Sequence, residues 1–145
     1  MVRIGSIGTK GARVDAAMRA DPTGAVRGPV RAWLRLEGAA ALVLAVGIYV
    51  HLDGQLLWLV PLLLLVDLSM VGYLLGPSAG AFTYNLAHNW AIGAAFVAIG
   101  AAGGWVPLVL VGAILVGHVG FDRLAGYGLK YPTAFADTHL GWIGR

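Results

Sequence analysis

Four long runs of apolar residues alternate with short polar or glycine-rich breaks along residues 31–126. Each run approaches the roughly 20 residues that an α-helix needs to cross a bilayer. The breaks HLDG, GPSAG and AAGGW have the composition of tight turns. Because connections this short join antiparallel neighbours, the pattern predicts an all-α polytopic membrane protein with an antiparallel four-transmembrane-helix bundle. The predicted helices cover residues 32–50, 55–75, 79–100 and 105–126.

Two segments of different character flank the predicted transmembrane domain, which spans residues 31–126. Residues 1–30 are rich in glycine and basic residues, and we expect a mobile cytoplasmic arm. Residues 127–145 carry aromatic side chains, among them Tyr127 and Phe135, that suit the interface between membrane and water. We therefore expect this segment to be an interfacial tail that folds back over the mouth of the bundle as a lid.

The overall composition agrees with a membrane protein. Hydrophobic residues make up 59% of the chain and charged residues only 12%, about half the charged share of an ordinary soluble domain. The mean hydropathy is +0.78, and no Lys or Arg occurs between Arg35 and Arg123. The chain has no cysteine, which excludes disulfides, thiolate nucleophiles and cysteine metal sites.

The distribution of basic residues predicts the orientation of the bundle. The three predicted loops carry no Lys or Arg, whereas seven basic residues lie at positions 3–35 and three at positions 123–145. The positive-inside rule therefore places both termini in the cytoplasm. Orientation also explains the basic arm without a nucleic-acid partner, so we expect the lipid bilayer as partner and no nucleic acid.

Small residues recur at helical spacing in two of the predicted helices. Gly100 and Gly104 form a GxxxG pair, and Ala113 and Gly117 are also four residues apart. Such pairs let helix backbones approach closely in lipid. Because the chain is rich in glycine, we assign these pairs to packing within one chain, which leaves a homodimer open.

Ionisable residues fall at similar depths in all four predicted helices. Asp67, His88 and His118 lie roughly 10–14 Å from the cytoplasmic ends of their helices at 1.5 Å per residue. Glu37 and Asp122 lie nearer to those ends. An ionisable group at membrane depth is costly unless it is paired, neutralised or solvated, so its presence points to function. The sequence therefore predicts one shared polar site in the cytoplasmic half of the bundle.

The helical phase of the polar residues supports a shared site. His118 and Asp122 are four residues apart and so lie on one face of their helix. Tyr84 and His88 have the same spacing, and Asn85 lies three residues before His88. Two helices thus present stripes of imidazole, carboxylate, phenol and amide groups that can face each other.

Acid–base catalysis is the chemistry that this set of residues favours. Burial and mutual charge separate the pKa values of neighbouring His and Asp groups, so that one can donate a proton and another can accept it. We expect isomerisation, cyclisation or hydrolysis of a lipophilic small molecule. The predicted catalytic residues are Asp67 and His118 as the core, with His88, Asp122 and Glu37 as partners. The predicted substrate-binding residues are Tyr73, Tyr84, Asn85, Arg123, Tyr127, Lys130 and His139.

Three alternatives use the same residues. We expect no cofactor, but Asp67, His88, His118, Asp122 and Glu37 offer ligands that suit a divalent metal, although the paired Glu-x-x-His motifs of carboxylate-bridged bundles are absent. A small proton-coupled exporter would use Glu37 as its membrane-embedded carboxylate. A structural ion-pair network would tie the cytoplasmic helix ends together without any substrate.

Four short stretches resemble a known family. They are RLEG at 35–38, DLSMVGYLLGP at 67–77, YNLAH at 84–88 and GHVGFDRLAGYGLKYPTAFADTHLG at 117–141. They are similar to the signature of a bacterial family of small membrane proteins known as domain of unknown function 4260, over about residues 31–144. The resemblance implies a four-helix architecture in a bacterial cytoplasmic membrane and no particular reaction. The similar blocks include Glu37, Asp67, Tyr84, Asn85, His88, His118, Asp122, Arg123 and His139.

Overall fold

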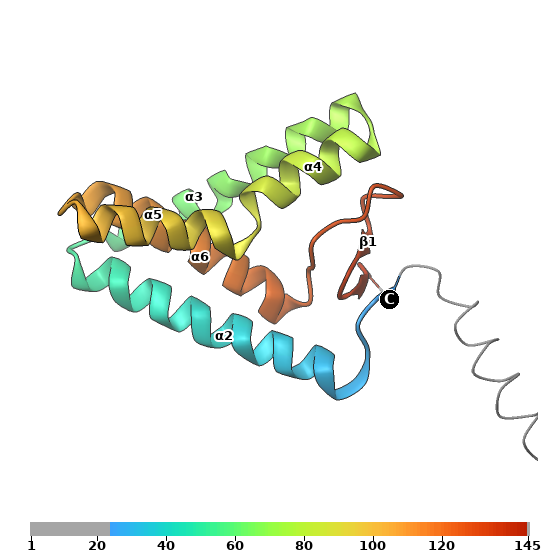
Figure 1. The fold of residues 1–145 in the computed structure, drawn as a ribbon, viewed down its shortest axis with the longest axis horizontal. Helices are drawn as coiled ribbons and strands as arrows, with labels where there is room; N and C mark the ends of the chain where they lie inside the picture. Colours follow the sequence, from blue (N-terminus) through green and yellow to red (C-terminus); the bar gives the residue numbers. More distant parts are fainter. Residues whose placement is uncertain (1–23, 145) are drawn as a thin grey trace, which may run out of the picture.

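The computed structural model describes residues 24–144 and is mostly helical (Figure 1). This confirms the predicted all-α class. Residues 1–23, most of the predicted basic arm, lie outside the described residues. The elements are α2 (Gly28–His51), α3 (Leu56–Leu65), the 3-10 helix η1 (Val66–Leu75), α4 (Pro77–Ala87), α5 (Trp90–Ala102), α6 (Val106–Ala125), and the two-residue strands β1 (Asp137–Thr138) and β2 (Gly141–Trp142).

Three of the described helices are long and apolar enough to cross a membrane. They are α2, the continuous helix α3–η1 over Leu56–Leu75, and α6. Their bounds lie close to three of the predicted segments. This length and composition indicate a membrane protein, because a helix of about 20 apolar residues matches the thickness of a bilayer.

The predicted helix over 79–100 is divided in the structure into α4 and α5. His88 ends α4, and Asn89 has an extended backbone with φ −110° and ψ 154°. The Asn89 side chain accepts a hydrogen bond from the backbone N–H of Ile92 at 3.2 Å and so caps the start of α5. An Asn at this position favours a new helix start over continuation, because its side chain replaces the missing backbone acceptor.

The 3-10 geometry of η1 decides which of its side chains share a face. Positions i and i+3 are nearly eclipsed in a 3-10 helix. Asp67, Met70 and Tyr73 therefore follow one another in a row, and Ser69 and Gly72 form a second row. Asp67 and Met70 face the site described below, whereas Tyr73 packs against Gly80 of α4 and the second row also faces α4.

The helices η1 and α4 form a tight hairpin that diverges from α2 (Figure 1). Glycines allow the close approach, since a Cβ added at Gly72 would overlap Thr83 and one added at Gly80 would overlap the ring of Tyr73. The Thr83 hydroxyl donates to the backbone oxygen of Ser69 at 2.8 Å across the hairpin. These contacts hold η1 in a fixed position relative to α4.

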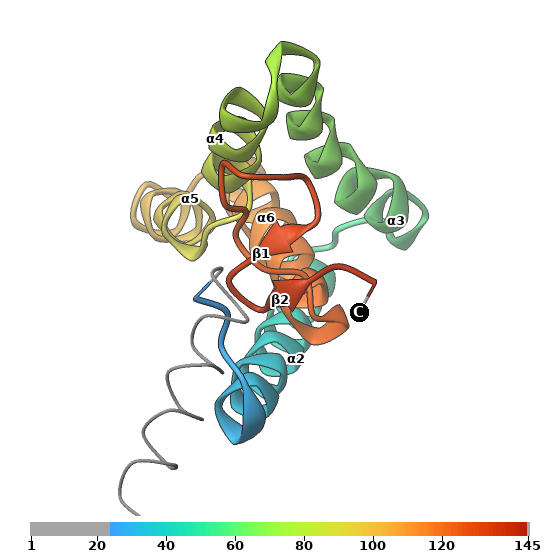
Figure 2. The ribbon, with the colours of Figure 1, turned by 90° about the vertical axis from the view of Figure 1, so that its right-hand side faces the viewer.

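Helix α6 lies at the centre of the fold, with α2 and α5 packed against it (Figure 2). Gly38 of α2 meets Gly120 of α6 with almost no space between the two backbones. Gly100 of α5 approaches Val109 of α6 in the same way, so Gly100 is used for packing within the chain, as predicted. A Cβ at Gly104 would contact nothing within 4 Å, so this glycine takes no part in that contact.

The segment after α6 folds back across the end of this helix, between the η1–α4 hairpin and α2 (Figure 2). Strand β1 pairs antiparallel with β2, Asp137 opposite Trp142, and Lys130 forms an isolated bridge with Thr138. Leu140 is fully buried beneath this turn. The backbone N–H of Val26 donates to the oxygen of His139 at 2.8 Å, which ties the segment that precedes α2 to the tail.

Candidate functional site

Four ionisable side chains from three parts of the fold converge on one point. Nε2 of His88 lies 2.9 Å from Nε2 of His118. Oδ1 of Asp67 lies 3.4 Å from both of these nitrogens, and Oδ2 of Asp122 lies 3.8 Å from both. We call this set the His–Asp cluster. The helices η1 and α6 and the break between α4 and α5 each contribute to it, as the predicted depths required.

Helical spacing and burial position the α6 side of the cluster. His118 and Asp122 lie one turn apart on α6 and are buried together with His88. The Tyr84 hydroxyl donates to Oδ2 of Asp122 at 2.6 Å, and the Tyr84 ring stacks on the imidazole of His88 at 3.7 Å between centroids. A hydrogen bond to an ionised carboxylate is shorter and stronger than one between neutral groups. Tyr84 therefore fixes Asp122 and His88 at once.

The break after α4 determines the tautomer of His88. Nδ1 of His88 lies 2.9 Å from the backbone oxygen of Tyr84, which can only accept, so Nδ1 carries a proton and donates it. Neutral His88 then has an unprotonated Nε2 that faces the other members of the cluster. Ser69, which was not among the predicted site residues, places its hydroxyl 3.5 Å from the same Nδ1.

Arg123 lies inside the structure, behind the cluster. Its side chain is buried, and its guanidinium donates to the backbone oxygens of Tyr127 at 2.8 Å and His88 at 3.3 Å. Arg123 thus ties the end of α6 to the break between α4 and α5. Arg123 does not belong to the described residues that line the cavity below.

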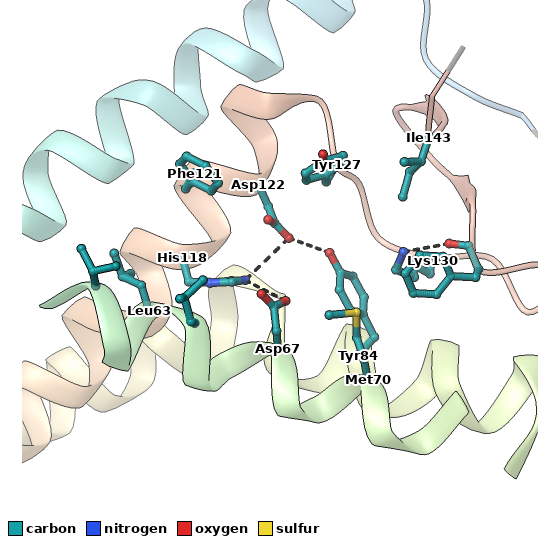
Figure 3. A pocket seen from close by; sticks show the side chains of 13 residues that line it. Leu63, Asp67, Met70, Tyr84, His118, Phe121, Asp122, Tyr127, Lys130 and Ile143 are labelled. Atoms are coloured by element: carbon teal, nitrogen blue, oxygen red, sulfur yellow. Dashed lines mark hydrogen bonds and ion pairs between the residues drawn. The ribbon is translucent and has the colours of Figure 1, made fainter. Parts of the chain in front are cut away.

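A cavity of about 450 Å³ lies beside the cluster, between α3–η1, α6 and the tail (Figure 3). Its polar residues are Asp67, Tyr84, His118, Asp122 and Lys130. The rest of the lining is apolar or aromatic and consists of Val60, Leu63, Leu64, Met70, Phe121, Tyr127, Phe135 and Ile143. Sequence reasoning missed most of these wall residues, because a leucine that faces a cavity carries no signal within a uniformly apolar helix.

Lys130 is the one Lys or Arg among the described residues that line the cavity. Its Nζ donates to the backbone oxygen of Phe135 at 2.8 Å and lies 3.8 Å from the centroid of the Phe135 ring and 4.7 Å from that of Tyr84. Burial lowers the pKa of Lys130 below its usual range, while Asp122 and Asp67 act in the opposite direction. Among the described residues, Lys130 forms no ion pair with Glu37 or Asp122.

Two predicted site residues hold the tail in place. Asn85 forms two hydrogen bonds with the backbone of Lys130, at 2.7 and 2.9 Å, so its amide is not directed at the cavity. His139 accepts a hydrogen bond at Nδ1 from the backbone of Leu129 at 2.8 Å. Burial and the charge of Arg123 lower the pKa of His139. The Asn85 contacts hold the tail against α4, and the His139 contact joins two segments of the tail to each other.

Two further predicted residues lie away from the cluster. Glu37 is exposed on α2 and belongs neither to the cluster nor to the described lining of the cavity. Its α2 face is turned away because Gly38, one residue later, is the position that packs against α6. Tyr73 packs edge-on against Phe135, with 5.1 Å between centroids, and its buried hydroxyl has no hydrogen-bond partner among the described residues.

Three members of the cluster have the arrangement of metal ligands. One ligand atom each from Asp67, His88 and His118 lies within 4.8 Å of the others. Imidazole and carboxylate together suit Zn, Fe or Mn. Without a metal, the same atoms form a proton-transfer network, since the His118 Nε2–H donates to Nε2 of His88. The site can therefore support acid–base chemistry or bind a divalent cation.

Comparison with known proteins gives a family and no activity. The model of the family described as "Domain of unknown function (DUF4260)" matches residues 31–143. No curated protein and no solved structure matches the chain. The match covers every member of the His–Asp cluster and almost all of the tail. The chain therefore belongs to the DUF4260 family.

Proposed function

We propose that the chain is an integral-membrane enzyme that performs acid–base catalysis on a lipophilic small molecule. The observation that carries this proposal is the cavity, whose walls are apolar and whose polar end is the His–Asp cluster. The proposal includes the orientation expected from the basic residues, with both termini on the cytoplasmic side of a bacterial cytoplasmic membrane.

The walls of the cavity support access from the bilayer. Val60 and Leu64 of α3 and Phe121 of α6 are exposed at the surface of the fold and also line the cavity. In a membrane these side chains contact lipid, so a molecule dissolved in the acyl region can reach the cavity without crossing water. Enzyme and ligand pockets commonly combine such apolar walls with a few convergent polar groups.

The positions of the polar groups support a division of roles. The Asp67 side chain is 34% exposed, whereas those of His118 and Asp122 are 5% and 8% exposed. Asp67 and His118 line the cavity and are 3.4 Å apart, which places a proton donor and a proton acceptor beside a bound molecule. Asp122, held by Tyr84, stabilises positive charge on the imidazoles. Isomerisation, cyclisation and hydrolysis all use this kind of proton transfer.

Isotope incorporation tests the enzyme proposal even while the substrate is unidentified. Purified chain in phosphatidylcholine nanodiscs is incubated with lipid extract from expressing cells, in D₂O or in H₂¹⁸O, and the lipids are compared by mass spectrometry. We expect at least one lipid to gain deuterium or ¹⁸O with the wild type. Asp67→Asn and His118→Ala should abolish the gain, and Leu44→Ala, at an exposed position on α2, should preserve it. Equal labelling by the wild type and His118→Ala would contradict the proposal.

A metal centre at the same cluster is the second candidate. The observation that favours it is the hydrogen bond from Nδ1 of His88 to the oxygen of Tyr84, since metal-binding His residues donate their second nitrogen to such an acceptor. Two nitrogens 2.9 Å apart can both lie about 2.0–2.1 Å from one ion.

Elemental analysis of the purified chain tests the metal candidate. We expect about one divalent ion per chain in the wild type, lost in His88→Ala and His118→Ala. His51→Ala, at the exposed end of α2, is the matched control and should retain the ion. A metal content that is the same in all four proteins would contradict a metal at the cluster. The exporter alternative uses Glu37 as its membrane-embedded carboxylate. Glu37 is exposed on α2, so the observations favour a site at the cavity over an exporter.

A further inference from the structure

Lys130 is a buried cation whose hydrogen-bonding capacity is largely unused. The residue is 5% exposed. An ammonium group has three donors, and Nζ makes one described hydrogen bond, to the oxygen of Phe135. The rings of Tyr84 and Phe135 contribute cation–π contacts. Within residues 24–144, none of the ion pairs joins Lys130 to a carboxylate.

A charge in this environment is costly unless it is paired, because burial removes its hydration. The cavity is the space that Lys130 shares with a ligand. An anionic group on the ligand would accept the remaining donors and neutralise the charge. We propose that the ligand is an amphiphile with an anionic headgroup, a carboxylate or a phosphate, that binds Lys130. This inference rests on the proposed function only in taking the cavity as the substrate site.

The layout of the cavity assigns the two ends of such a ligand. Figure 3 shows Lys130 at one end of the polar groups and His118 with Asp67 at the other, with Tyr84 and Asp122 between them. The carboxylates of Asp67 and Asp122 repel an anion from the cluster end. The headgroup therefore lies at Lys130, and the part of the ligand that reacts lies nearer to His118.

The tail contributes an aromatic ring at the headgroup end. Phe135 lies beside Nζ of Lys130, and the ring of Tyr73 packs against Phe135. The buried Tyr73 hydroxyl has no hydrogen-bond partner among the described residues. Tyr73 is not among the described residues that line the cavity, so it acts at this end only by supporting the ring of Phe135. Apolar walls from α3 and α6 then receive the acyl chain, with its far end directed toward lipid.

Photolabelling with matched probes tests the headgroup preference. The full chain in phosphatidylcholine nanodiscs is exposed to diazirine-labelled hexadecanoic acid, hexadecyl phosphate, hexadecanol and hexadecyltrimethylammonium, and labelled peptides are identified by mass spectrometry. We expect one or both anionic probes to label cavity residues about tenfold or more above the alcohol, the factor expected for a hydrogen bond to a charged group. The acid and phosphate arms distinguish the two headgroups. Equal labelling by all four probes would overturn the inference.

Variants locate the preference at Lys130. Lys130→Met should reduce the ratio of labelling by the anionic probe to labelling by the alcohol to about one. Lys130→Arg keeps the charge and should retain a preference, so it separates loss of the charge from a general effect of substitution at this position. Arg35→Met removes an exposed charge of α2 and is the matched control for membrane electrostatics. A preference that survives Lys130→Met, that is lost equally in Arg35→Met, or that disappears with EDTA would overturn the role of Lys130. Labelling requires no turnover, so it can succeed where the enzyme proposal fails.

Discussion

Substitution of Gly38 by Ala tests whether the contact between α2 and α6 positions the site. A Cβ at Gly38 would lie 2.6 Å from Cβ of Arg123, 2.8 Å from the oxygen of Gly120 and 2.9 Å from the nitrogen of Leu124. Two of these three atoms belong to backbone, which cannot rotate away. Gly47 lies on the same helix, and a Cβ there would contact nothing within 4 Å. Gly47→Ala is therefore the matched control.

The size of the effect follows from the overlap. Ordinary van der Waals contact begins at 3.4 Å, so Gly38→Ala must separate the helices by about 0.8 Å. A gap of 0.5–1 Å forfeits roughly a quarter to a half of the dispersion energy of each neighbouring contact. Overpacking of this kind costs about 1–3 kcal/mol. Both variants share the helix-propensity gain of Ala over Gly, up to about 1 kcal/mol, which cancels in the comparison.

Unfolding by SDS in mixed micelles, followed by tryptophan fluorescence, gives the free energy of unfolding of both variants. We expect Gly38→Ala to be less stable than Gly47→Ala by about 1–3 kcal/mol. Labelling of the cavity should also decrease in Gly38→Ala, because Asp122 and Arg123 move with α6. If the two variants were equally stable, α2 and α6 would not be in close backbone contact, and the packing of these two helices would be refuted.

Two further predictions concern the cluster and the tail. Tyr84→Phe should lower the free energy of unfolding by about 1.5–3 kcal/mol, because Asp122 loses a charge-assisted hydrogen bond, and the effect should vanish in an Asp122→Asn background. The lowered pKa of His139, caused by burial and Arg123, means that the unfolded chain binds a proton more readily. The stability from neutral His139 is thus full above pH 6.5, the ordinary pKa, and is lost as the pH falls through the lowered value. Hydrogen exchange at the Leu129 amide should therefore accelerate as the pH falls below 6.5, relative to the intrinsic rate, and unchanged protection would contradict this reasoning.

The sequence predicted the apolar helices well, because length and hydropathy alone decide whether a helix can cross a membrane. The bounds of α2, α3–η1 and α6 lie close to the predicted ranges. Division of the third predicted helix was missed, although Asn89 is a typical N-cap residue. In an apolar run, a single polar residue at a helix start looks the same as one inside a helix. For the 3-10 geometry of η1, the sequence contains no residue that signals it as Asn89 signals a helix start.

The sequence predicted those site residues whose position follows from their depth in a helix. It missed those whose position depends on how the helices pack or on the path of the irregular tail. Asp67, His88, His118 and Asp122 converge, as their distances from the helix ends required. Glu37 lies at a suitable depth but on the wrong face of α2, since the phase of one helix against another depends on packing. The partners of the tail residues could not be predicted, because an irregular segment has no periodicity from which its contacts follow.

The break between α4 and α5 separates the two groups of residues that form the His–Asp cluster. Asp67 and Tyr84 belong to the η1–α4 hairpin, His118 and Asp122 belong to α6, and His88 lies at the break itself. Rotation of the hairpin about residues 88–89 would change the distance between Asp67 and His118 directly, while the pair His118 and Asp122 would move as one body. The geometry of the cluster and the width of the cavity thus both depend on the angle between α4 and α5 at this break.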